Sequence, residues 1–109
     1  MGMIETTSIA AASATVGTNL LANSKQANSR AARRIRGVAL TGSAAAGDTE
    51  VALFVDTLEI GRIFNSATGF PNRDSIMPLV AMVPAGAQVY ASVVDAPATN
   101  PINLMMAYE

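Results

Sequence analysis

The sequence predicts an all-β chain: a single β-sandwich of about seven or eight short strands with an extended N-terminal arm. Residues 50–56 and 87–94 alternate in side-chain face, with Val51, Leu53 and Val55 together on one face of the first run. Gly, Pro, Asn and Asp clusters separate the apolar runs at short intervals. Half of the 109 residues are hydrophobic and only 14% are charged, so the chain can fold around one core.

The chain divides into a polar N-terminal arm, residues 1–32, and a β-sandwich body, residues 33–109. The arm is rich in small and polar side chains, and a short strand over residues 4–11 can pair at a sheet edge. Residues 17–22 favour a second short strand followed by a loop. A helix over residues 18–32 is the alternative, but the Asn and Ser side chains there compete with helical hydrogen bonds. We expect the arm to become ordered on neighbouring subunits.

The first half of the body predicts three strands. Residues 34–41 form the first strand, and Gly37 interrupts its alternation as a bulge would. Residues 50–56 and 58–64 form a hairpin around a tight turn, with Gly61 as a second predicted bulge.

The second half predicts three more strands after a loop over residues 65–75. Residues 76–83 are apolar but contain Pro78, which suits an edge strand better than a central one. A Pro-Gly turn leads into the strand at 87–94. A Pro-bounded loop then precedes a closing strand at 102–108.

Charge is distributed unevenly along the chain. Residues 1–36 hold five basic residues and one acid, whereas residues 37–109 hold two basic residues and seven acids. The basic cluster lies where the arm meets the body, and it is the candidate contact site for assembly or nucleic acid: Lys25, Arg30, Arg33, Arg34 and Arg36. No aromatic residue interleaves with it, so base stacking is not indicated. A subunit contact is the favoured interpretation, ahead of a solvated, charge-guarded edge strand and of phosphate binding.

The residue inventory argues against catalysis. The chain has no His and no Cys, and Lys25 is its single lysine. It therefore lacks the commonest general base and the usual zinc and copper ligands. We predict no catalytic residues, no metal site and no cofactor, and we expect the protein not to be an enzyme. No apolar run reaches the roughly 20 residues that a membrane-spanning helix needs, so no membrane span is expected.

Three stretches together give a resemblance to a known class of proteins. Residues 14–21 (ATVGTNLL), 34–40 (RIRGVAL) and 84–90 (PAGAQVY) follow one another in a layout similar to that of small bacteriophage virion proteins of β-sandwich or single jelly-roll type. The resemblance implies a jelly-roll-like sandwich and a structural role in a particle, as a capsid subunit, a minor capsid or cement protein, or the base of a spike.

The partners implied by this resemblance are further copies of the chain, other virion proteins, or both. The implied location is the virion, assembled in the host cytoplasm. Two other function classes stay open at this point. One is a ligand- or carbohydrate-binding β-sandwich module, and the other is a nucleic-acid-binding accessory protein.

Overall fold

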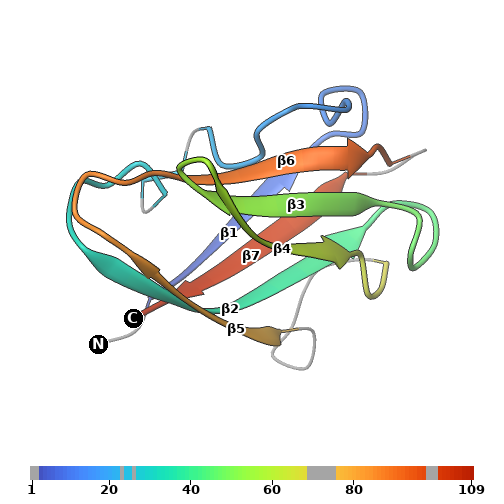
Figure 1. Cartoon of the computed structure of the whole chain (residues 1–109). Coiled ribbons are helices and arrows are strands. Elements are labelled where there is room, and N and C mark those ends of the chain that lie inside the picture. Colours follow the sequence, from blue (N-terminus) through green and yellow to red (C-terminus); the bar gives the residue numbers. More distant parts are fainter. Residues whose placement is uncertain (1–2, 23, 26, 69–75, 98–100) are drawn as a thin grey trace.

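Seven strands form two antiparallel sheets that face each other (Figure 1). The structure is a computed structural model, and it describes residues 3–22, 24–25, 27–68, 76–97 and 101–109. One sheet has the order β1-β7-β2-β5 and the other β4-β3-β6. The strands are β1 (Met3–Ile9), β2 (Arg33–Gly42), β3 (Glu50–Val55), β4 (Leu58–Phe64), β5 (Met77–Val83), β6 (Val89–Asp95) and β7 (Ile102–Tyr108). The predicted all-β sandwich is confirmed.

The core fills the space between the two sheets. It takes alternate side chains from β7 and β2 on one side and from β3 and β6 on the other, for example Met106, Leu40, Leu53 and Val93. These side chains are at most 1% exposed. The alternation predicted along residues 50–56 and 87–94 therefore sets which face of each strand points inward.

The predicted irregularities appear close to the expected glycines. The register of β2 against both neighbours shifts between Ile35 and Gly37, which confirms the bulge predicted at Gly37. In the hairpin, the register shifts so that Leu53 pairs with Gly61 while Phe54 pairs with Glu59. Strand β5, with Pro78, is an edge strand as predicted. The loop predicted over residues 65–75 lies outside the described residues from residue 69 onward.

Residues 17–20 run beside β6 and complete the topology of a jelly roll. Gly17 donates its main-chain N–H to Val93, Val93 donates to Thr18, and Leu20 donates to Ala91, at 2.8–3.0 Å. Counted as a second strand, this segment makes eight consecutive segments ordered 1-8-3-6 and 2-7-4-5, the winding of a jelly roll of two Greek keys.

The strand predicted over residues 17–22 is shorter than expected. It contributes a single β-bridge, between Asn19 and Ser92. The side-chain oxygen of Asn19 accepts hydrogen bonds from the main-chain N–H groups of Leu21 and Ala91, at 3.0 and 3.1 Å. Because a side chain takes the place of a main-chain acceptor, the chain turns away from β6 after this residue.

The described part of the predicted arm packs on this chain's own sandwich. Strand β1 pairs with β7 along its whole length. The segment after it crosses from β1 to β6 and buries Ala14, Leu20, Leu21 and Ala27 to within 2% of full burial. The division at residues 32 and 33 thus does not separate an arm from a body in space. Two large leucines in an otherwise polar segment supply the apolar surface that closes this side of the sandwich.

Of the described glycines, Gly42 leaves the least room for a side chain. Its φ is +110°, and a Cβ there would lie 2.3 Å from the carbonyl oxygen of Pro101. Gly17 also has a positive φ of +89°, but a Cβ there would meet nothing within 4 Å. A substitution at Gly17 would therefore cause backbone strain alone, whereas one at Gly42 would cause both strain and a steric clash.

We expect Gly42→Ala to lower the free energy of unfolding by about 3–5 kcal/mol, because strain and overlap add. Gly17→Ala is the matched control and should cost only about 1–2 kcal/mol, from strain alone. Urea unfolding of the three proteins measures both values. Equal losses would show that the β2 end can move away from residues 101–102.

Candidate functional site

The five residues of the predicted basic cluster lie at one end of the sandwich but differ in burial and in partners. Strand β2 begins at this end, and the turn between β5 and β6 lies beside it (Figure 1). Arg33 is buried, Arg34 is paired with the C-terminal residue, and Lys25, Arg30 and Arg36 are exposed. Alternation along β2 puts Arg34 and Arg36 on the exposed face and Arg33 on the inward face with Ile35.

Arg33 holds the turn of residues 27–31 against the start of β6. One terminal nitrogen of its guanidinium donates to the carbonyl oxygens of Ser29 and Ala31, both at 2.9 Å. The other donates to Ala27 at 2.7 Å and to Ala87 at 3.2 Å. Burial lowers the pKa of this guanidinium, and the nearby Tyr108 opposes the shift. The side chain is 8% exposed, so these carbonyl contacts occupy it within its own chain.

Arg34 and Glu109 form an exposed ion pair across the β2–β7 ladder. Arg34 Nε donates to Glu109 Oε2 at 2.8 Å, and a terminal guanidinium nitrogen contacts the same oxygen. This hydrogen bond and the positive charge lower the pKa of the Glu109 carboxyl. Arg36 lies two residues further along β2 and is also exposed.

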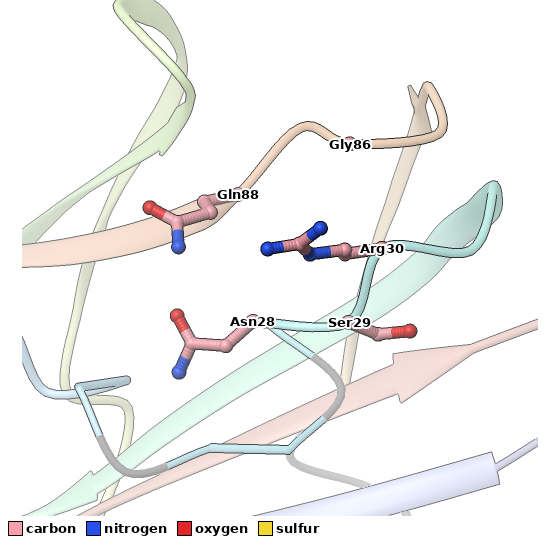
Figure 2. Close-up of a pocket in the computed structure, with 5 residues that line it drawn as sticks. All are labelled: Asn28, Ser29, Arg30, Gly86 and Gln88. Atoms are coloured by element: carbon pink, nitrogen blue, oxygen red, sulfur yellow. The ribbon is translucent and has the colours of Figure 1, made fainter.

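Arg30 lines a polar hollow of about 300 Å³ together with Asn28, Ser29, Gly86 and Gln88. Figure 2 shows the guanidinium extending toward the side chains of Asn28 and Gln88, which come from different segments. The main chain fixes the two walls together, since Gly86 N–H donates to the Arg30 carbonyl at 2.8 Å. Among the described residues, Arg30 takes part in no salt bridge.

The remaining polar groups of this hollow have defined orientations. Gln88 Oε1 accepts from the hydroxyl of Tyr90 at 2.5 Å, which leaves the Gln88 amide N–H₂ as a donor. The Asn28 amide nitrogen is directed at the carbonyls of residues 21, 22 and 24, at 2.7–3.3 Å. The donors available to a guest are therefore the Arg30 guanidinium and the Gln88 amide, a set suited to an oxyanion.

A buried polar cluster at the same end was not predicted. Ser24 Oγ donates to Glu5 of β1 and accepts from the N–H of Ala27 at 3.1 Å. Tyr108 lies beside them, 2% exposed. Burial and, to a smaller extent, the charge of Glu5 raise the pKa of Tyr108 to about 12, while Arg33 and Ser24 act in the opposite direction. The only sequence signal was a lone acid within the polar strand at residues 3–9.

Acids gather at the opposite end of the sandwich. Glu50 begins β3 and pairs in register with Asp95, the last residue of β6. Asp48 lies in the preceding loop, where its Oδ1 accepts from the hydroxyl of Ser43 at 2.7 Å. These three carboxylates define what we call the acidic end. The described residues contain no group of three or more side chains suited to holding a metal ion.

Exposed apolar side chains concentrate on the edge strands β4 and β5. Of the seven large hydrophobic side chains exposed among the described residues, five belong to these two strands: Leu58, Phe64, Met77, Val80 and Met82. Val80 and Met82 point out of one sheet and Phe64 points out of the other. No segment among the described residues forms an apolar helix of membrane-spanning length.

The contacts of Arg33 give one prediction for this end of the sandwich. Arg33→Lys should lower the free energy of unfolding by about 3 kcal/mol, because one ammonium group cannot reach carbonyls on both sides of the site. Arg34→Lys is the matched control, and its exposed pair should cost less than about 0.5 kcal/mol. Thermal and urea unfolding measure both. If Arg33→Lys is as mild as Arg34→Lys, the buried contacts do not hold the turn in place.

The buried tyrosine gives a second prediction. An unfolded tyrosine loses its proton near pH 10, whereas folded Tyr108 keeps it until about pH 12. In that window the folded state binds more protons, so stability falls as pH rises, by about 2–3 kcal/mol in total. Tyr108→Phe should remove this alkaline loss in pH-dependent urea unfolding. Tyr90 lies on β6 and is only half-buried, so Tyr90→Phe should retain the loss. An unchanged slope in Tyr108→Phe would contradict this assignment.

Comparison with known proteins gives no family. No protein-family model matches the chain, and no curated protein matches it. Among solved structures, the chain is similar to the cryo-EM structure of a virus-like particle of extra small virus from the giant freshwater prawn Macrobrachium rosenbergii. That match has a TM-score of 0.32 and 14% sequence identity, and it covers 99% of this chain and 77% of the other.

Proposed function

We propose that this protein is a structural subunit of a virus particle, of the small bacteriophage virion type, and that it acts by contact with further copies of itself. The observation that carries the proposal is the set of large apolar side chains exposed on the edge strands β4 and β5. Val80 and Met82 are 69% and 66% exposed on an edge strand, and Leu58 is 69% exposed on the other edge. Soluble monomers rarely concentrate large apolar side chains in this way.

The edges themselves favour association. Strands β4 and β5 each end a sheet, so each presents a row of main-chain groups on its outer edge. Charges that would guard such edges are few, since the described residues of the two strands carry only Glu59 and Arg62. These two pair with each other at 3.0 Å. Pro78 blocks only one donor position. A protein contact on this side would cover both the apolar side chains and the strand edges.

The opposite side of the sandwich is already covered. Residues 10–22 lie over the gap between β1 and β6, with main-chain bonds to β6. One lateral side is therefore closed by the chain itself, while the other is left for a partner. This asymmetry suits a subunit that is added to an assembly in a fixed orientation.

Catalysis has no part in this proposal. The chain lacks His and Cys. Among the described residues, the serine hydroxyls that contact carboxylates, Ser24 with Glu5 and Ser43 with Asp48, are only 5% and 1% exposed. Strong nucleic-acid binding is not favoured by a net charge of −1. A carbohydrate site usually offers exposed aromatic rings, and the chain has no Trp.

The test compares Val80 with Val16, which are equally exposed at 69% and 70% but lie on opposite sides of the sandwich. Wild-type protein should form species larger than the 11.2 kDa monomer, measured by native mass spectrometry and light scattering. Val80→Lys combined with Met82→Lys should shift these toward monomer, because charge in an apolar contact is costly.

Val16→Lys should leave the distribution of masses unchanged. Circular dichroism of each variant establishes that it is folded. A wild-type protein that stays monomeric at high concentration, alone and with candidate shell proteins, would overturn the proposed function. If Val16→Lys and Val80→Lys with Met82→Lys change the masses equally, the contact between copies does not lie on β4 and β5.

A further inference from the structure

The two ends of the sandwich carry opposite charge, and this separation is set by the fold. The basic end holds Lys25, Arg30 and Arg36 as exposed cations, and they outnumber its exposed carboxylates. Asp56 accepts from the main-chain N–H of Gln88 at 3.0 Å, and Glu109 is paired with Arg34. The acidic end holds Asp48, Glu50 and Asp95. Strand β2 joins the two ends, and its ten residues span roughly 33 Å. The longest extent of the molecule is 36 Å, so the charges lie at the ends of its long axis.

The hollow at the basic end offers donors to a guest. The Arg30 guanidinium extends into it, and the Gln88 amide presents its N–H₂ because Tyr90 occupies its oxygen (Figure 2). The backbone bond from Gly86 to the Arg30 carbonyl and the Arg33 contacts to residues 27, 29, 31 and 87 fix both walls. A site with fixed walls and a charged donor can bind a carboxylate without first ordering its own loops.

We infer that this hollow binds carboxylate groups of the acidic end of a second copy of the chain, so that copies associate head to tail. Screening limits charge interactions to about 10 Å at 0.1 M salt. The two ends of one molecule are too far apart to satisfy each other, and each is free to act on a neighbour. Glu50 and Asp95 are cross-strand partners at the acidic end, so two carboxylates are available there to a guanidinium and an amide.

The contact has a definite symmetry. Different surfaces of the two copies meet, so the contact is heterologous and generates a ring or an open chain instead of a two-fold dimer. Because it is a contact between copies, the inference rests on the proposed function. The head-to-tail contact uses other residues than the contact through β4 and β5, however. It is polar, whereas the contact through β4 and β5 is apolar. The two contacts therefore respond differently to salt.

The experiment removes the charged groups of one end of the sandwich at a time. Arg30→Gln removes the cation of the hollow, and Glu50→Gln with Asp95→Asn removes two carboxylates of the acidic end. Both are made in the background of Val80→Gln with Met82→Gln, which weakens the apolar contact without adding charge beside Arg34, the register partner of Met82. Arg62→Gln is the control, because it removes an exposed cation on β4, away from the hollow.

Sedimentation velocity at 50 mM and 500 mM salt gives the readout. We expect the parent to associate about tenfold more weakly at the higher salt, and each end variant to lose association at low salt. An equimolar mixture of the two end variants should form pairs and stop there. In such a pair the intact hollow of one variant meets the intact acidic end of the other, and no further copy can be added.

Three results would overturn the inference. They are salt-insensitive association of the parent, an Arg30→Gln variant that behaves like Arg62→Gln, and a mixture that fails to pair. Binding of a 20-nucleotide single-stranded RNA that is lost in Arg30→Gln, with self-association unchanged, would instead identify a phosphate site. In each of these cases salt-resistant association of the wild type, lost in Val80→Lys with Met82→Lys, would leave the proposed function standing.

Discussion

The Arg33 guanidinium joins two parts of the chain that share few ladder bonds. It donates to three carbonyls of the turn at residues 27–31 and to one at the start of β6. A neutral side chain could not satisfy four carbonyl oxygens in a buried place, and each unsatisfied one would cost stability. By fixing that turn, Arg33 also fixes the walls of the hollow at Arg30 and the path by which the N-terminal segment enters β2. The basic end of the molecule is thus organised around one cation that faces inward.

Closure of one lateral side follows from the same segment. A sandwich with sheets of four and three strands has two open sides, and each exposes the edge of its core. On the β1 and β6 side, Leu20 and Leu21 fill this gap and residues 17–20 pair with β6 as a shortened eighth strand. On the β4 and β5 side, apolar side chains remain exposed. The N-terminal segment covers the β1 and β6 side only, so the exposed apolar side chains of β4 and β5 have no cover from it.

Much of this fold could be predicted because its signals are local. Alternation at residues 50–56 and 87–94 needs only the period of a strand, and Gly37 marked a bulge without knowledge of its neighbours. The path of the N-terminal segment was predicted less well. Burial of Leu20 depends on a gap between sheets that exists only after distant strands have paired. The cluster of Arg residues was found by its charge, but the hydrogen-bond partners of Arg33 include carbonyls as far away as Ala87 and could not be predicted locally.

The two proposed contacts run in different directions, and this constrains what the subunit can build. A head-to-tail contact along the 36 Å axis gives a ring or a chain of copies. An apolar contact on the β4 and β5 side acts across that axis and joins neighbouring rings or chains. One contact alone yields a bounded oligomer or a filament, whereas two in different directions generate a surface. High salt weakens the polar contact and spares the apolar one, so salt separates the two steps of assembly. A shell that loosens along one direction first, as salt is raised, is the behaviour that this arrangement requires.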